Sequence, residues 1–143
     1  MAYKLFLDTN VFLDVFLERT PDWQESEIIL QLAAQNKIEV FTSANNLVNV
    51  IYSLKKQKLT PDEIIQLMEL TLTYTDLADT TKSAFVLALG AGFSDLEDAI
   101  QYYTALQIKA IDYFITSNTK DYKKASRQLP VVTAKQFMAL YNK

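Results

Sequence analysis

The chain has 143 residues, of which 50% are hydrophobic and 22% charged, and its formal net charge is -3. This composition predicts one globular domain over residues 1–143 and excludes a disordered chain. The longest apolar stretches are too short to span a bilayer, and no signal peptide is recognisable, so we expect a cytoplasmic protein that does not contact the membrane.

The residue types missing from the chain restrict the chemistry that it can perform. The sequence contains no Cys and no His, which excludes thiol nucleophiles, imidazole bases, Ser-His-Asp triads and nearly all zinc sites. Any bound metal is expected to be a hard cation held by oxygen ligands, such as Mg²⁺ or Mn²⁺. The negative net charge argues against broad electrostatic binding of nucleic acid, but not against a local basic patch.

Short apolar strands alternate with longer helical segments along the chain. In chain order, the expected strands are residues 3–7, 38–42, 73–77, 111–116 and 130–132. The expected helices are residues 11–17, 21–36, 44–58, 61–72, 81–89, 95–108 and a last one from 134. This alternation predicts an α/β fold, a three-layer α/β/α sandwich with a central parallel sheet of about four to five strands.

Capping residues mark several of the expected helix starts. Thr20 precedes Pro21 as an N-cap, Ser43 and Thr133 are further N-caps, and Thr60 forms a capping box with Glu63. A second capping box is expected from Ser94 to Glu97, and it explains Glu97 fully. Asp95 then lies at the first helical position, where an acid favours the helix dipole. Asp98 lies beyond the capping positions and therefore requires another role.

Polar side chains follow the expected strands at their carboxyl ends, where ligands bind in open α/β sheets. Asp8 follows the first strand, Ser43 the second, and the segment 116–121 a later one. We expect these segments to converge, and the helix that begins near Asp95 to join them. Helix capping is the alternative role for Asp8, and a solvated loop is the alternative setting for Asp121.

Three segments together resemble the PIN domain, the fold of metal-dependent nucleases that includes many toxins of bacterial toxin–antitoxin pairs. They are Leu7-Asp8-Thr9-Asn10-Val11, Phe93-Ser94-Asp95-Leu96-Glu97-Asp98-Ala99 and Ile115-Thr116-Ser117-Asn118-Thr119-Lys120-Asp121-Tyr122. The resemblance covers almost the whole chain. It implies that Asp8, Asp98 and Asp121 are the catalytic, metal-binding residues.

The resemblance also implies an activity and its partners. The expected activity is that of a Mg²⁺- or Mn²⁺-dependent endoribonuclease, which cleaves RNA phosphodiester bonds through metal-activated water. An antitoxin protein and a second copy of the chain are further implied partners. Supporting roles are expected for Asn10, Asn49, Asp95, Glu97, Thr116, Ser117 and Asn118.

One position departs from the family pattern. The family places a Glu on the helix after the second strand, and that position is Asn49 here. An amide keeps an oxygen ligand but carries no charge, so a weaker hold on one ion is expected, and a second ion is not.

Basic and aromatic residues near Asp121 are candidates for contact with RNA. The candidates for phosphate contact are Lys120, Lys123, Lys124 and Arg127, with a plain solvated surface as the alternative. Tyr122 is the aromatic residue considered for base stacking. Asn45 and Asn46, on the helix after the second strand, are explained by capping and solvent contact.

Two other functions stay open at this point. Asn49 motivates a PIN-fold module that binds RNA or protein without cleaving it. A phosphoryl-transfer domain on a similar sheet would use Asp8 as phospho-acceptor. A haloacid-dehalogenase-type phosphatase would need an Asp in place of Asn10, and a receiver would need a second acid beside Asp8.

Overall fold

The computed structural model describes residues 2–125 and 128–143 and contains a parallel five-stranded sheet. The strand order is β3-β2-β1-β4-β5, so the first strand is central. The strands are β1 (Lys4–Leu7), β2 (Glu39–Ser43), β3 (Thr75–Ala78), β4 (Tyr113–Ile115) and β5 (Val131–Val132). The helices of the described residues are α1 (Thr9–Leu17), α2 (Trp23–Ala34), α3 (Ala44–Lys56), α4 (Pro61–Tyr74), α5 (Lys82–Leu89), α6 (Leu96–Leu106), α7 (Ala134–Tyr141) and the 3-10 helix η1 (Thr119–Tyr122).

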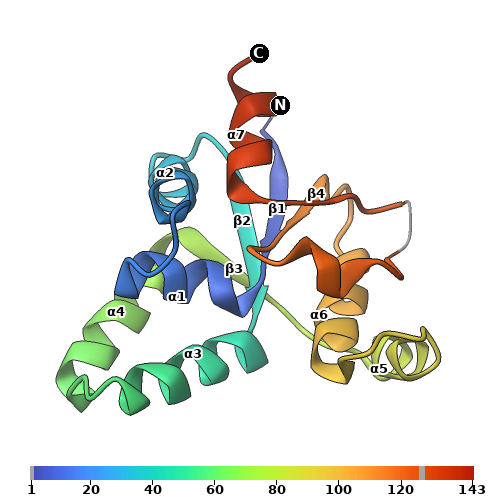
Figure 1. The fold of residues 1–143 in the computed structure, drawn as a ribbon, viewed down its shortest axis with the longest axis horizontal. Coiled ribbons are helices and arrows are strands. Elements are labelled where there is room, and N and C mark those ends of the chain that lie inside the picture. Colours follow the sequence, from blue (N-terminus) through green and yellow to red (C-terminus); the bar gives the residue numbers. More distant parts are fainter. Residues whose placement is uncertain (1, 126–127) are drawn as a thin grey trace.

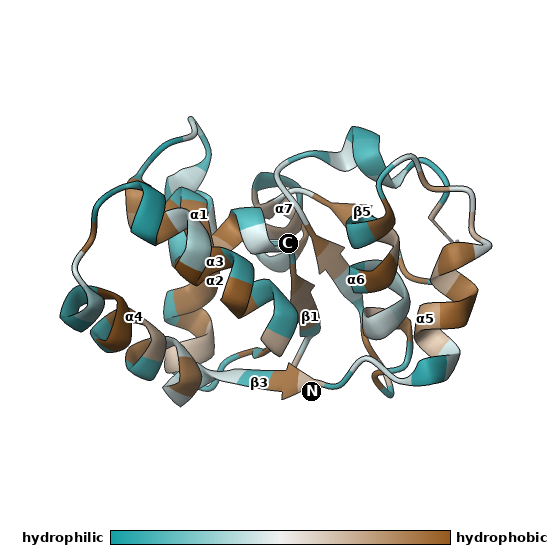
Figure 2. Cartoon of the chain, turned by 90° about the horizontal axis from the view of Figure 1, so that it is seen from below, coloured by the Kyte–Doolittle hydropathy of each residue, from teal (hydrophilic) through white to brown (hydrophobic). Residues whose placement is uncertain are grey.

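The central strand serves two hydrophobic cores because its side chains alternate between the faces of the sheet. Leu5 and Leu7 pack in one core with residues of α1, α2, α3, α4 and α7. Phe6 points the other way and stacks on Phe114 at 5.4 Å, in the core that α5 and α6 cover. Figure 1 shows α1 to α4 on one side of the sheet and α5 with α6 on the other. In Figure 2, β1 is hydrophobic and lies in the middle of the molecule. The predicted three-layer α/β/α sandwich is therefore confirmed.

The expected helix caps are mostly confirmed. Ser43 accepts a hydrogen bond from the Asn46 backbone N–H, and Thr60 forms the predicted capping box with Glu63. Thr133 forms another capping box at the start of α7, with Gln136. None of the helices in the described part of the chain is long and apolar enough to cross a membrane.

Four predicted helix starts are wrong by one or two residues: α1 begins at Thr9, α2 at Trp23, α5 at Lys82 and α6 at Leu96. α2 begins at Trp23, because Thr20 and Pro21 are used in a turn in which the Trp23 N–H donates to the Thr20 carbonyl. α6 is capped by Asp95 instead of Ser94. The Asp95 Oδ1 atom accepts from the N–H groups of both Glu97, at 2.8 Å, and Asp98, at 3.2 Å. An aspartate at the N-cap thus pairs two backbone donors that are otherwise unpaired.

Candidate metal centre

Asp8 directly follows the central strand β1, at the carboxyl edge of the sheet. Its backbone N–H donates to the Ile115 carbonyl at 3.0 Å, which extends the ladder between β1 and β4. Asp8 occupies the N-cap position of α1, but its side chain makes no capping hydrogen bond. The backbone N–H groups of Thr9 and Asn10 lower the pKa of Asp8, but capping alone does not account for its side chain.

The Asp8 carboxylate is 3% exposed and is held by hydrogen-bond donors. Thr116 Oγ1 donates to Asp8 Oδ2 at 2.7 Å. Burial raises the pKa of Asp8 above its usual range, while Thr116, Gln101 and the nearby backbone N–H groups of Asn10 and Thr9 act in the opposite direction. These donors stabilise the charged form that a cation needs.

Asp98 approaches Asp8 from the first turn of α6. The Tyr122 hydroxyl lies between the two residues, 3.3 Å from Asp98 Oδ1 and 3.4 Å from Asp8 Oδ2. These two carboxylate oxygens therefore cannot be more than about 6.7 Å apart, the two distances added together. Burial and the negative charges of Asp8, Asp95 and Asp121 raise the pKa of Asp98 to about 7.

Asp121 is exposed and lies on η1, at the outer side of the same edge. Its Oδ2 atom accepts from Asn118 Nδ2 at 2.9 Å. The backbone N–H of Asn118 in turn donates to Thr116 Oγ1 at 3.2 Å. Thr116 and Asn118 thus connect Asp8 to Asp121, and the structure brings the three sequence-predicted acids to one edge of the sheet.

The other supporting residues have different surroundings. Asn10 Oδ1 accepts from Arg19 Nη2 at 3.0 Å, and Arg19 is also paired with the buried Asp14 at 2.8 Å. Asn49 is half-buried on α3. Glu97 and Ser117 are exposed. Among the described residues, no group of three or more acids has the geometry of a ready metal cage.

The donor set nonetheless fits a hard divalent cation. All of the polar atoms of Asp8, Asp98 and Asp121 that face the site are oxygens, the ligands that Mg²⁺ prefers. Burial and, after it, repulsion by neighbouring carboxylates raise the pKa of Asp98, and a cation between the carboxylates would relieve the repulsion. Mg²⁺ commonly keeps several waters and uses only one or two carboxylates, so a complete protein cage is not required.

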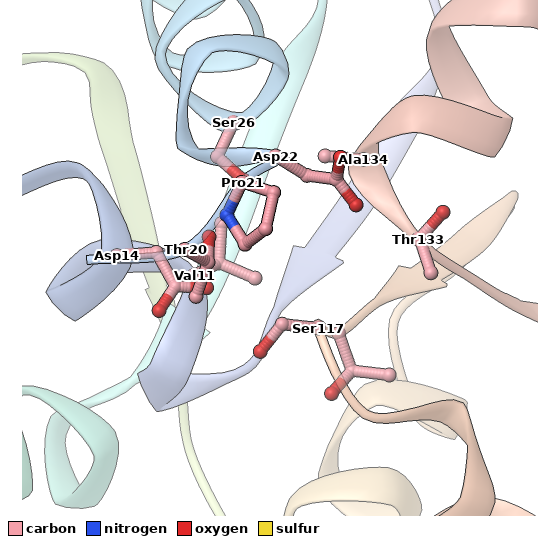
Figure 3. Close-up of a pocket in the computed structure, with 10 residues that line it drawn as sticks. Val11, Asp14, Thr20, Pro21, Asp22, Ser26, Ser117, Thr133 and Ala134 are labelled. Carbon is pink, nitrogen blue, oxygen red and sulfur yellow. The ribbon is translucent and has the colours of Figure 1, made fainter. Parts of the chain in front are cut away.

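Two cavities flank the acidic edge. One has a volume of about 180 Å³ and is bordered by Thr116, whose hydroxyl binds Asp8. Figure 3 shows its other walls, with Asp14 and Val11 from α1, Ser117 after β4 and Thr133 before α7. The second cavity, of about 190 Å³, is lined by Asp121 and by residues that include Lys120, Lys123 and Lys124. Arg127, the remaining predicted basic contact, lies outside the described residues.

Sequence reasoning misassigned two side chains and missed a third. Tyr122 is not a stacking surface for a base, because it is 4% exposed and its ring packs on Phe114 at 4.7 Å. Asn46 does not contact solvent, because it is fully buried and donates to Gln101 Oε1 at 2.7 Å. Gln101 lies three residues after Asp98 and so shares its helix face, a spacing that could have identified it.

Comparisons with known proteins agree with this architecture. The sequence model of the PIN domain matches residues 4–120. The chain is 29% identical to Ribonuclease VapC1 of Aquifex aeolicus (strain VF5) over 144 residues, which cover 97% of this chain and 96% of that protein. A solved structure of VapBC2 from Rickettsia felis, bound to a promoter DNA fragment, superposes with a TM-score of 0.66 at 18% identity, over 91% of this chain and 98% of that one. With the family model matching most of its length, the chain belongs to the PIN domain family.

Proposed function

We propose that the protein is a divalent-metal-dependent ribonuclease that hydrolyses RNA phosphodiester bonds. The observation that carries this proposal is the meeting of Asp8 and Asp98, which share the Tyr122 hydroxyl at 3.4 and 3.3 Å. Asp8 is buried and Asp98 half-buried, and two carboxylates this close are costly unless a cation neutralises them. The name of the similar protein, Ribonuclease VapC1, supports RNA as the substrate.

In this proposal, Asp8, Asp98 and Asp121 hold Mg²⁺ or Mn²⁺, and Asn118 and Thr116 orient them. A bound divalent ion supplies Lewis acidity to the phosphodiester and lowers the pKa of water. Thr116 holds the Asp8 carboxylate through its 2.7 Å hydrogen bond to Oδ2. Asp98 has to lose its proton before it can act as a ligand, and its pKa of about 7 makes that loss depend on pH near neutrality.

The RNA backbone is proposed to lie over the lysine-lined cavity beside Asp121. Lys120, Lys123 and Lys124 border this cavity and are exposed. Three cations next to an acidic centre can hold phosphates on either side of the scissile bond, although the chain carries a net negative charge. Arg127 belongs to the same basic segment of the sequence.

A protein antitoxin and a second copy of the chain are proposed partners. The solved VapBC2 structure supports the class of partner. An apolar groove of about 510 Å³ lies between α3 and α4 and is bordered by Ile51, Ile65 and Met68 among others. Exposed apolar residues on α5 form a separate surface, largely brown in Figure 2. Both surfaces leave apolar side chains exposed in the isolated chain, and a bound protein partner would cover them.

The direct test combines Mn²⁺ titration by calorimetry with cleavage of a mixed-sequence single-stranded RNA. We expect wild-type protein to bind Mn²⁺ and cleave, and Asp8→Asn to lose both properties. Asp62→Asn is the matched control, since Asp62 is an exposed acid in the first turn of α4. No heat and no cleavage from the wild-type protein, with Asp8→Asn indistinguishable from it, would refute the proposal.

The second candidate function is a PIN-fold module that binds RNA without cleaving it. Asn49, half-buried where the family pattern has a Glu, favours this alternative. It predicts that wild-type protein raises the fluorescence anisotropy of a fluorescein-labelled single-stranded RNA, which reports binding. It also predicts that addition of Mn²⁺ produces no cleavage of that RNA. Cleavage that requires both Mn²⁺ and Asp8 would exclude it.

A further inference from the structure

A line of buried polar side chains connects the sheet to Asp8. Thr42 Oγ1 donates to the Leu7 carbonyl at 2.9 Å. Asn46 Nδ2 donates to Thr42 Oγ1 at 3.1 Å and to Gln101 Oε1 at 2.7 Å. Asn46 Nδ2 also lies 3.5 Å from the carbonyl of Leu7, the residue before Asp8, and the Gln101 side-chain amide lowers the pKa of Asp8. We call the side chains of Asn46 and Gln101 the amide relay.

The charge of Asp8 fixes the polarity of the amide relay. An ionised carboxylate only accepts hydrogen bonds, so Gln101 has to present its NH₂ group to Asp8. Its carbonyl oxygen then faces Asn46, and Asn46 has to present its own NH₂ group in return. Thr42 therefore accepts from Asn46 and directs its proton to the Leu7 carbonyl, as the distances require. Reversing either amide would place two acceptors against each other.

The amide relay has no competition from water. Thr42 and Asn46 are 0% exposed and Gln101 is 6% exposed. The backbone of Asn46 is held as well, because its N–H donates to Ser43 Oγ at 3.1 Å. A buried hydrogen bond in such surroundings is strong, and a broken one leaves a polar group unpaired at a cost of about 1–3 kcal/mol.

Asn46 of the amide relay lowers the stability of the fold. Asn is a poor helix former, and Asn46 lies within α3. Its Oδ1 atom is buried, and the described residues offer it no hydrogen-bond partner. A leucine or methionine at such a position would pack without an unpaired oxygen. Groups that weaken a fold locally are most often found where function needs them.

We propose that Asn46 and Gln101 are positioning residues that hold the Asp8 carboxylate in its metal-binding orientation. This inference rests on the proposed metal role of Asp8. Thr116 donates to Asp8 from the β4 side, and the Gln101 amide, which Asn46 holds at 2.7 Å, acts on the same carboxylate from α6. Loss of one such outer partner of a metal ligand typically lowers metal affinity roughly 10–100-fold.

The first test is Mn²⁺ affinity, measured by calorimetry on three variants. Gln101→Met keeps the length of the side chain and removes the amide. Gln101→Glu keeps its shape and the oxygen toward Asn46, but places an oxygen in the position of the donor to Asp8. Both should weaken Mn²⁺ binding roughly 10–100-fold. Gln66→Met, on an exposed position of α4, is the matched control and should bind as wild type does.

The second test needs no metal and keeps the proposal falsifiable if one variant fails to fold. In the metal-free wild-type protein, the side-chain NH₂ resonances of Gln101 and Asn46 should both shift upon Asp8→Asn. The side-chain NH₂ resonances of Gln66, which lies on an exposed position of α4, should not shift. Unmoved Gln101 resonances would overturn the relay, whatever the metal results are.

The outcomes also separate this inference from the proposed function. Wild-type protein that binds no Mn²⁺ would overturn the proposed function, and the positioning role with it. Wild-type binding that Gln101→Met and Gln101→Glu leave unchanged, with only a lower melting temperature, would overturn the positioning role alone. A purely structural role predicts that second pattern.

Discussion

Thr116 and Asp8 lie side by side across 108 residues of sequence, with the threonine hydroxyl 2.7 Å from Asp8 Oδ2. Both residues directly follow strands, and the register pairs Leu7 with Ile115 just before them. The parallel ladder of β1 and β4 therefore sets their contact. The hydroxyl supplies a charge-assisted hydrogen bond to a carboxylate that water barely reaches.

Thr116→Val should weaken the site while leaving the core packed, because valine has the same shape without the donor. The charged form of Asp8 would lose a hydrogen bond, so its pKa would rise further. We expect Mn²⁺ affinity to fall about 10-fold in calorimetry at pH 7. Thr73→Val, at an exposed position of α4, is the control. Equal affinities for the two variants would show that Thr116 does not support Asp8.

The stability of the metal-free protein should decrease as pH rises from about 4 to about 7. Asp98 has a pKa of about 7 in the fold and an ordinary value of 3.8, so the folded state binds its proton more tightly than the unfolded state does. Above pH 7 both states are deprotonated and the trend ends. We expect a melting temperature about 5 °C lower at pH 8 than at pH 5, by calorimetry without metal.

Asp98→Asn provides the control for this pH trend. The variant carries no titrating group at position 98, so the decrease between pH 5 and pH 8 should shrink markedly. Saturating Mn²⁺ should also reverse the trend in wild-type protein, because the ion binds the deprotonated carboxylates. A slope that is the same in both proteins would assign the trend to other groups.

Asn49→Glu should strengthen metal binding, because it adds a charged oxygen ligand where the family pattern has one. The position is half-buried on α3, so the new charge would be screened less than a surface charge. We expect a gain of roughly 10-fold in Mn²⁺ affinity, together with faster RNA cleavage. Asn45→Glu makes the same change at an exposed position of the same helix and should alter neither quantity.

The exposed apolar face of α5 should mediate self-association. Phe85, Val86, Leu87 and Leu89 are 45–58% exposed. We expect wild-type protein to sediment as a dimer at micromolar concentration, and Val86→Asp to weaken the dimer at least 10-fold by desolvating a charge. Leu70→Asp, at a 60% exposed position of α4, is the control. A wild-type monomer at that concentration would remove α5 as a dimer surface.

The sequence was sufficient to predict features that depend on neighbouring residues, such as helix caps, or on the parallel order of the strands. The apolar run before Asp8 predicts a buried strand, and the caps Ser43, Thr60 and Thr133 predict the starts of three helices. Parallel strands then bring Asp8 and the segment after β4 to one edge without further information.

The same pattern failed where the partner is distant in the sequence. Asn46 and Gln101 are 55 residues apart, and Tyr122 is 114 residues from Asp8. The spacing of residues along the chain does not indicate contacts over such separations. The sequence therefore predicts Asn46 to contact solvent and Tyr122 to be exposed, whereas both are buried. The start of α6 failed for a local reason, because Ser94 and Asp95 are both good caps and only the structure shows which one reaches the donors.

The ladder between β1 and β4 also affects how the chain finds its fold. Leu7 pairs with Ile115, and the Asp8 N–H donates to the Ile115 carbonyl. A shift of β1 by one residue against β4 would turn Leu5, Phe6 and Leu7 each to the opposite face of the sheet. If the shift moves β1 toward the sheet interior, it also carries the Asp8 carboxylate into the sheet, away from the Thr116 hydroxyl. An ionised group there would make the misaligned sheet unfavourable. The Asp8 carboxylate thus disfavours this misaligned pairing of β1 with β4.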